Sequence, residues 1–294
     1  MKILNLGLES FYRTILEQGN EAVNISFKPF KLLDYIKKIF KNYEKVFEAN
    51  KNAFKILSNG HPVLIDLKLA KEVIPELENN LILHAGPPIE IKRLSGPVRG
   101  AIEGALIFER KAKSLEEAKA LLQSEKIKIE PCHHYNAVGP MAGVLSSNMW
   151  VFVVKNKLKG NIAYCSLNEG LGKVLRFGAN TPDVIDRLKW MRDVLGPILK
   201  EAIKLKKEID LRNITSQALL MGDECHNRNI AATNLFLKEI TPALLETKFS
   251  KKEIQSVINF ISQNPHFYLN ISMAACKSIA DSIKGIKNSS IVYT

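Results

Sequence analysis

The chain has 294 residues, of which 46% are hydrophobic, and its formal net charge is +12. This length predicts about two domains, and this apolar content excludes a chain that is disordered throughout. No apolar run approaches the roughly 20 residues of a membrane helix, and the apolar stretch at the amino end is too short for a signal peptide, so we expect a cytoplasmic protein that makes no membrane contact.

Strands and helices alternate through the first part of the chain. Strands are expected at residues 2–6, 21–27, 62–67 and 81–83, and helices at residues 10–17, 32–57 and 69–77. This alternation implies a mostly parallel sheet, in which ligands bind beyond the carboxyl ends of the strands. We therefore predict a Rossmann-like α/β domain over residues 1–88, with Gly7, Asp66 and residues 84–88 at its ligand-binding rim.

The rest of the chain predicts two further regions and an α/β fold class overall. Residues 89–180 are expected to form a central α+β domain with polar motif loops, with helices at 97–109 and 115–125 and strands at 126–130, 151–155 and 163–167. Residues 181–294 are expected to be mainly helical, at 182–206, 212–221, 229–246, 251–262 and 266–284. The final NSSIVYT indicates the start of another strand, so we expect this region to be incomplete at its C-terminal end.

Charge and cysteine spacing exclude several classes of protein. The lysines are scattered and mostly interleaved with Glu, without an aromatic stripe, so nucleic-acid binding is not expected and a small anionic metabolite is the better partner. The four cysteines form no CxxC pair, which excludes zinc ribbons and thioredoxin-like motifs. Cys276 is expected to be a small buried hydrophobe.

Two blocks contain turn-forming residues beside cationic or imidazole side chains. In HAGPPIEIKRLSGPVRGAIEGAL (84–106), the substrate- and phosphate-binding candidates are Arg93, Arg99, Gly86 and Gly96, while the alternative is close helix packing with structural arginines. In PCHHYNAVGPMAG (131–143), the catalytic candidates are His133, His134 and Asn136, because imidazole serves as an acid, a base or a metal ligand. The metal remains open, with Mg²⁺ as a candidate, and no other cofactor is indicated.

Two later blocks are equally polar. In SLNEGLGKVLRFG (166–178), Asn168, Glu169 and Arg176 are substrate-binding candidates and Gly170 and Gly172 phosphate-binding candidates, while the alternative is a capped turn with surface charges. In MGDECHNRN (221–229), the catalytic candidates are Asp223, Glu224 and His226, and the substrate-binding candidates are Asn227, Arg228 and Asn229. The alternative for this second block is a satisfied buried network.

Taken together with QALLMGDECHNRNIAATNLFLKE, KILNLGLESF and NPHFYLNISMAACK, these blocks resemble the YlbE-like family along essentially the whole chain. That family includes a subunit of oxamate carbamoyltransferase, which works in allantoin degradation beside a subunit that resembles acyl-CoA synthetases. The resemblance implies conversion of oxalurate and phosphate to oxamate and carbamoyl phosphate by a hetero-oligomer. The chain departs from the family pattern at Ser95 and Tyr135, and the family continues past Thr294.

Carbamoyl transfer would give these candidates definite roles. Arg99 and Arg176 would bind phosphate, His133 or His134 with Asn136 would donate to the oxyanion, His226 would protonate the leaving nitrogen, and Arg228 would hold the oxalurate carboxylate. The alternatives are a non-catalytic partner subunit of an acyl-CoA-synthetase-like complex, a nucleotide- or CoA-linked ligase component, and a metabolic enzyme of another specificity.

Overall fold

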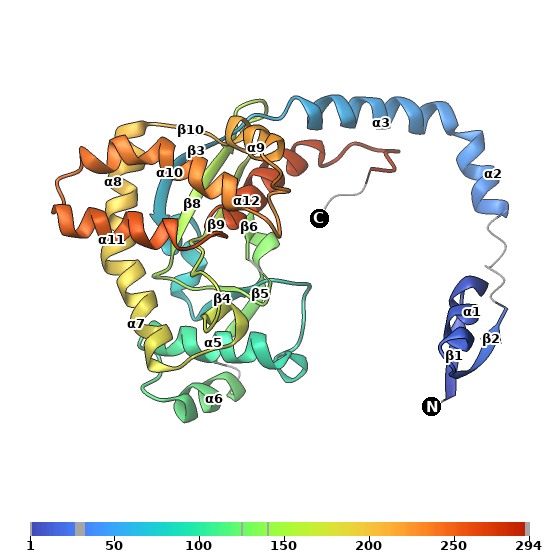
Figure 1. The fold of residues 1–294 in the computed structure, drawn as a ribbon, viewed down its shortest axis with the longest axis horizontal. Coiled ribbons are helices and arrows are strands. Elements are labelled where there is room, and N and C mark those ends of the chain that lie inside the picture. The colour runs from blue at the N-terminus through green and yellow to red at the C-terminus, as the bar shows by residue number, and fades with distance from the viewer. Residues whose placement is uncertain (1, 27–32, 125, 140, 292–294) are drawn as a thin grey trace. The chain divides into compact units, whose positions relative to one another are not determined.

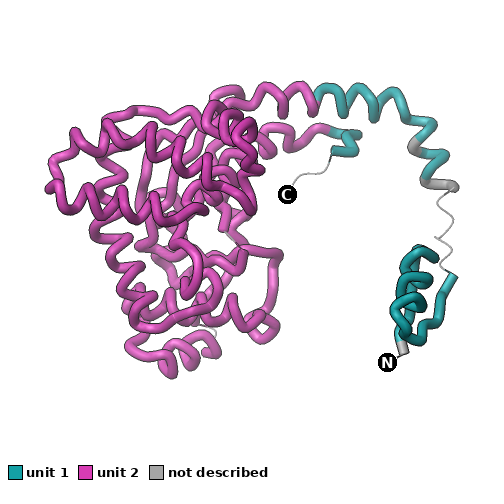
Figure 2. The backbone as a smooth tube through the Cα atoms, in the orientation of Figure 1, with its two compact units in different colours: residues 1–52, 287–291 teal, residues 53–286, 292–294 magenta. Residues whose placement is uncertain are grey.

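The structure is a computed structural model that describes residues 2–26, 33–124, 126–139 and 141–291. The chain forms two compact units, one of residues 1–52 with 287–291 and one built mainly from residues 53–286 (Figure 2). Phe27, expected to end a strand, and residues 292–294, expected to begin one, lie outside the described residues. The three-part division at residues 88 and 180 stays a prediction.

The first unit begins with the expected β-α-β segment. Strands β1 (Lys2–Leu6) and β2 (Glu21–Ile25) pair in parallel around α1 (Glu9–Glu17). Asn5 Nδ2 donates to Asn24 Oδ1 across the two strands at 2.7 Å. Helix α2 (Leu33–Lys41) follows, and α3 (Tyr43–Ser58) begins in this unit. The expected strand-helix-strand order is therefore confirmed, and the helical stretch expected over residues 32–57 forms two helices.

The second unit contains a five-stranded sheet with the order β10-β3-β8-β9-β6. Its strands are β3 (Pro62–Leu69), β6 (Ala137–Val138), β8 (Trp150–Asn156), β9 (Ile162–Ser166) and β10 (Ile209–Asp210). All its neighbouring strands are antiparallel except β6 and β9. Consecutive side chains of β8 from Trp150 to Val154 are buried, so both faces of this sheet are covered.

A smaller sheet lies beside the first, with the order β5-β4-β7. Strands β4 (Leu81–His84) and β5 (Lys128–Pro131) are parallel, and β7 (Val144–Leu145) is antiparallel to β4. The register places His84 opposite Pro131. Because parallel strands point the same way, the segments that follow β4 and β5 leave the sheet at the same edge.

The Rossmann-like layer expected over residues 1–88 is not confirmed. Its four strands fall into three sheets, since β1 and β2 pair only with each other, β3 joins β10 and β8, and β4 joins β5 and β7. The reason is that the continuous apolar run of β3 indicates burial on both faces, which central parallel strands and helix-covered antiparallel strands share. The broader prediction of a mixed α/β fold with several sheets is confirmed.

Helices surround the sheets of the second unit (Figure 1). They are α4 (Ala70–Val73), α5 (Gly96–Phe108), α6 (Leu115–Gln123), α7 (Pro182–Trp190), α8 (Gly196–Lys206), α9 (Leu211–Leu220), α10 (Ile230–Leu245), α11 (Lys251–Ser262) and α12 (Leu269–Ala280). Helix α12 packs across β9, β8, β3 and β6. The rings of Phe152, Phe236 and Phe267 meet beneath it, with centroids 5.8 to 6.3 Å apart. Among the described residues, no helix is both long and apolar enough to span a bilayer.

Helix α8 offers a test of this packing at Gly196. A Cβ at this position would overlap the indole of Trp150. We expect Gly196→Ala to destabilise the fold by about 1–3 kcal/mol, because the surrounding core is too tightly packed to accept the methyl group. Chemical denaturation measures this loss. Gly96→Ala is the matched control, because Gly96 also begins a helix but has open space around it. Equal free energies of unfolding for the two variants would contradict the close contact between Gly196 and Trp150.

Candidate functional site

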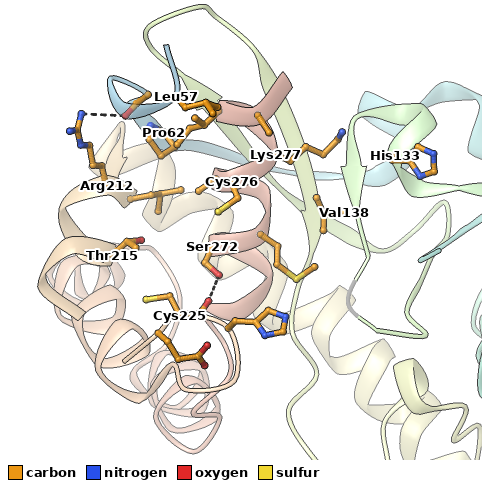
Figure 3. Close-up of a pocket in the computed structure, with 18 of the residues that line it drawn as sticks. Leu57, Pro62, His133, Val138, Arg212, Thr215, Cys225, Ser272, Cys276 and Lys277 are labelled. Atoms are coloured by element: carbon orange, nitrogen blue, oxygen red, sulfur yellow. Dashed lines mark hydrogen bonds between the residues drawn. The ribbon is translucent and has the colours of Figure 1, made fainter. Parts of the chain in front are cut away.

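A cavity of about 700 Å³ lies within the second unit (Figure 3). We call it the histidine cavity. Six separate parts of the chain contribute to its wall: the segment 57–62, the segments after β4 and β5, helix α9, the loop over residues 221–229, and helix α12. Its chemically active side chains are His133, Arg212, Thr215, Glu224, Cys225, His226, Ser272, Cys276 and Lys277. Most of its remaining lining is apolar.

The parallel pairing of β4 and β5 forms one side of the cavity. Ala85 and Gly86 follow β4, Cys132 and His133 follow β5, and all four line the cavity. Gly86 has φ +116°, a backbone conformation that side chains rarely permit. Ala85 and Gly86 of the predicted rim therefore line this cavity, where the first two blocks converge, whereas Gly7 and Asp66 do not; the ligand-binding role of the rim stays a prediction.

His133 is the imidazole that β5 presents to this space. The pKa of His133 lies below its ordinary value of 6.5, first because partial burial disfavours the charged ring and then because His134, Lys277 and His84 add positive potential. The neutral ring therefore predominates at pH 7. A neutral imidazole can accept a proton from one reactant or donate a hydrogen bond to another.

Lys277 brings a positive charge to the cavity from α12. Its side chain is 11% exposed, and Nζ lies 3.1 Å from Asp281 Oδ2, one turn further along. Figure 3 shows this side chain extending toward His133. The sequence-based prediction missed Lys277, although a basic residue within the otherwise small and apolar run SMAACKSIA was a usable signal.

The loop over residues 221–229 is held by hydrogen bonds on its inner side. Asp223 Oδ2 accepts from the backbone N–H of Ala232 at 2.9 Å, in the first turn of α10. Ser272 Oγ on α12 donates to the carbonyl oxygen of Cys225 at 2.7 Å (Figure 3). This anchoring leaves Glu224, Cys225 and His226 on the cavity wall.

The remaining candidates of this loop do not line the cavity. Asn229 is fully buried, and its Nδ2 donates to the carbonyl oxygen of His226 at 2.6 Å. Arg228 is exposed, and its Nη1 donates to the carbonyl oxygen of Gly222 at 3.2 Å. Asn227 is also exposed. Catalysis by Asp223 and substrate binding by Asn227, Arg228 and Asn229 stay predictions.

Two residues of the second block also lie off the cavity wall. His134 Nδ1 is 3.2 Å from Glu130 Oε2, in a pair that is nearly half exposed. Asn136 adopts φ +53°, and its carbonyl oxygen accepts from the N–H of Tyr164. Asn tolerates this left-handed conformation well, so the turn alone accounts for Asn136. Their catalytic roles stay predictions.

The third block forms a separate, largely buried network. Asn168 is fully buried; its Oδ1 accepts from the N–H of Gly170 at 2.9 Å, and its carbonyl oxygen accepts from Asn264 Nδ2 at 3.0 Å. Arg176 Nη2 donates to the carbonyl oxygen of Gly170 at 2.8 Å, and Glu169 Oε2 accepts from the N–H of Leu175. Burial raises the pKa of Glu169 and lowers that of Arg176.

The structure therefore does not bring this third block to the histidine cavity. None of Asn168, Glu169, Gly170, Gly172 and Arg176 lines it. Their hydrogen bonds within the loop account for much of the polarity of the block. Their substrate- and phosphate-binding roles stay predictions.

The first block is divided between different surroundings. Gly86 lines the histidine cavity, whereas Arg99 lines another cavity beside α5. Arg93 is exposed at the end of a 3₁₀ turn (Ile91–Arg93), and Gly96 begins α5. Only Gly86 is thus placed beside His133 and His226, and the binding roles of all four stay predictions.

Three thiols line the histidine cavity, and all are held in the protonated form. Burial raises the pKa of Cys132 to about 12 and that of Cys225 to about 11, with Asp223 and Glu224 adding to the second shift. Desolvation of the sulfur by neighbouring side chains also raises the pKa of Cys276, although the residue as a whole is exposed. A protonated thiol is a poor nucleophile, so these thiols are not primed for attack at neutral pH. The expectation that Cys276 is buried was wrong, because it lies on the exposed, cavity-facing side of α12.

Sequence reasoning placed His84 at the predicted rim without giving it a chemical role, and it missed Arg212. His84 is 1% exposed, and its Nε2 has no hydrogen-bond partner among the described residues. Arg212 on α9 donates from Nη1 to the carbonyl oxygen of Gly60 at 3.4 Å at the cavity edge (Figure 3). Within the described ranges, no three His, Cys, Asp or Glu side chains group closely enough to hold a metal ion.

Comparison with known proteins shows the family to which this chain belongs. The family described as oxamate carbamoyltransferase subunit AllG matches residues 127–294, more than half of the chain. The chain belongs to this AllG family. The resemblance drawn from the motif blocks is therefore confirmed at the level of an oxamate carbamoyltransferase subunit, while the YlbE-like name stays a prediction.

Individual relatives agree with this assignment. The chain is 42% identical to oxamate carbamoyltransferase subunit AllG of Escherichia coli K12, over 85% of this chain and 60% of that protein. It is 40% identical to the uncharacterized protein YahG of the same organism, over 100% of this chain and 64% of that protein. A crystal structure of a conserved protein of unknown function from Enterococcus faecalis V583 matches 85% of this chain and 60% of that one, with a TM-score of 0.83 and 45% identity. The chain thus spans less than two thirds of these relatives.

The electrostatics of His133 can be tested by NMR titration. We expect the His133 pKa to lie below 6.5, and Lys277→Met to raise it, because this substitution removes a positive charge that disfavours the imidazolium. The matched control is Lys284→Met, which removes an exposed lysine that does not line the cavity. A His133 pKa that Lys277→Met leaves unchanged would contradict the proximity of the two side chains.

Proposed function

We propose that this chain is a carbamoyltransferase subunit that acts on oxalurate and phosphate in the cytoplasm, releasing oxamate and carbamoyl phosphate. One observation carries the proposal. Two histidine blocks that lie far apart in sequence contribute His133 and His226 to a single cavity, which Lys277 also enters. Membership of the AllG family supports the choice of reaction.

The proposed chemistry is an acyl transfer in which one bond forms and one breaks. A phosphate oxygen attacks the carbamoyl carbon of oxalurate and forms a tetrahedral oxyanion. Collapse breaks the bond between that carbon and the nitrogen of the oxamate portion, and this nitrogen takes up a proton. Such a reaction needs a cation for phosphate, a donor for the oxyanion and an acid for the leaving nitrogen.

The side chains of the histidine cavity match these needs. We propose that Lys277 binds phosphate, because its charge lies beside His133. The neutral ring of His133 donates a hydrogen bond to the oxyanion in this proposal. His226 on the facing loop is the proposed acid, and Arg212 the proposed partner of the oxalurate carboxylate. Arg99, Arg176 and Arg228, expected earlier to hold anions, do not line this cavity, so their roles pass to Lys277 and Arg212 in the proposal.

We also propose that the chain works in a hetero-oligomer with an acyl-CoA-synthetase-like subunit. A specific observation favours a partner at this site. Leu219, Leu220, Met221 and Ile230 are 53%, 89%, 65% and 56% exposed around the loop that carries His226. Clustered exposed apolar side chains mark interaction surfaces. A subunit that covers them would exclude water from the cavity.

The proposed transfer is tested with the complex reconstituted from this chain and its partner subunits. We expect His133→Asn to lower the rate of carbamoyl phosphate formation from oxalurate and phosphate by about 10²–10³-fold, the usual cost of losing one donor to the oxyanion, because the shorter side chain withdraws the ring N–H. His61→Asn is the matched control, because this ring also lies 3.2 Å from a carboxylate oxygen, that of Asp210, but does not line the cavity, and its rate should stay near that of the unaltered complex.

Two results would overturn the assignment. Full activity of His133→Asn would remove His133 from the chemistry. Full activity of a complex in which this chain carries both His133→Asn and His226→Gln would favour the alternative of a non-catalytic partner subunit.

A further inference from the structure

A second cavity, of about 900 Å³, lies elsewhere in the same unit. Helices α5 and α6, strand β5 and residues 89–92 form its wall, and no residue is shared with the histidine cavity. We call it the Glu103 cavity. Its charged lining residues are Glu90, Lys92, Arg99, Glu103, Lys119, Lys128 and Glu130.

Glu103 is the most deeply placed of these charges. Its residue is 5% exposed, yet within the described ranges its carboxylate forms neither a hydrogen bond nor an ion pair. Burial raises the pKa of Glu103, and Lys119 and then Arg99 oppose that shift. The Glu103 oxygens are not among the fully buried polar atoms that lack a partner, so the carboxylate faces the cavity, where a ligand can supply one.

The surrounding cations are also unpaired. The side chains of Arg99, Lys119 and Lys128 make no hydrogen bond or ion pair with the described part of the chain. By contrast, Lys92 lies 2.9 Å from Glu90, and Glu130 lies 3.2 Å from His134. Beside these two pairs, three exposed cations, Arg99, Lys119 and Lys128, line the same cavity as the carboxylate of Glu103.

The cavity therefore contains, close together, cations that can bind an anionic group and a carboxylate that can accept hydrogen bonds. Arg99 precedes Glu103 by one turn of α5, so the two residues lie on the same face of that helix. The guanidinium and the lysine ammonium groups attract a carboxylate or phosphate, and the Glu103 carboxylate accepts N–H groups. A simple anion would satisfy the cations only and would be repelled by Glu103.

We propose that the Glu103 cavity binds a small anion that carries amide N–H groups next to its negative group. In this site the N–H groups donate to Glu103, and the anionic group is held by Arg99 with Lys119 and Lys128. Both oxamate and carbamoyl phosphate have this chemistry. The choice of these two compounds rests on the proposed function, whereas the site itself lies at residues that do not line the histidine cavity.

The test is isothermal titration calorimetry of the full chain with oxamate, carbamoyl phosphate, acetate and inorganic phosphate as separate probes. Comparison of oxamate with carbamoyl phosphate shows whether the site prefers a carboxylate or a phosphate as the anionic group. We expect Arg99→Gln to remove a binding component for whichever amide-bearing anion binds. Lys113→Gln is the matched control, because it removes an exposed positive charge outside the cavity and should leave that component intact.

Glu103→Leu separates the amide-recognition role of Glu103 from simple anion attraction. This variant should lower the affinity for the amide-bearing anion by about tenfold or more, because the cavity loses a charged hydrogen-bond acceptor. The affinities for inorganic phosphate and acetate should not fall. Circular dichroism and thermal melting establish that each variant is folded.

Three outcomes would contradict the proposal. The absence of binding by both amide-bearing anions, unaltered binding by folded Arg99→Gln, or equal weakening of phosphate and of the amide-bearing anion by Glu103→Leu would overturn it. A component lost in His133→Asn but kept in Arg99→Gln belongs to the histidine cavity, so failure of this inference and failure of the proposed carbamoyl transfer remain distinguishable.

Discussion

The parallel pairing of β4 with β5 is the constraint on which the histidine cavity depends. With His84 opposite Pro131, the chain leaves both strands at one edge of the sheet, and Gly86 and His133 reach the same space. Backbone hydrogen bonds fix this register, so the position of His133 is set by the sheet rather than by a free loop. A shift by one residue would turn the side chains of β5 to the opposite face and displace the turn that carries His133.

Helix α12 supplies the other half of the arrangement. It packs across the five-stranded sheet and turns Ser272, Cys276 and Lys277 toward the cavity. Ser272 holds the carbonyl oxygen of Cys225, which ties the loop that carries His226 to the same helix. One rigid element thus positions a cation directly and an imidazole through its loop. Rigid support of this kind favours precise placement of reacting groups.

Polar density alone does not separate a structural network from an open site. The block around Asn168 is as polar as the block around His226, yet much of its hydrogen-bonding capacity is satisfied by Gly170, Asn264 and other buried partners. Glu103, by contrast, comes from a helix whose sequence is mostly apolar, and it is left without a partner in a cavity. The informative feature is therefore a charged group that lines a cavity without a hydrogen-bond or ion-pair partner, which only coordinates reveal.

The sequence by itself determined where most strands and helices lie, which blocks contain chemistry, and the relationship to an oxamate carbamoyltransferase subunit. Those features depend on local periodicity and on contiguous motifs. Only the tertiary structure decided that β3 pairs antiparallel with β8, and that His133 and His226 share a cavity with Lys277. Strand partners and shared cavities arise from contacts between distant segments, and the hydrophobic pattern of one segment does not encode which other segment it will meet.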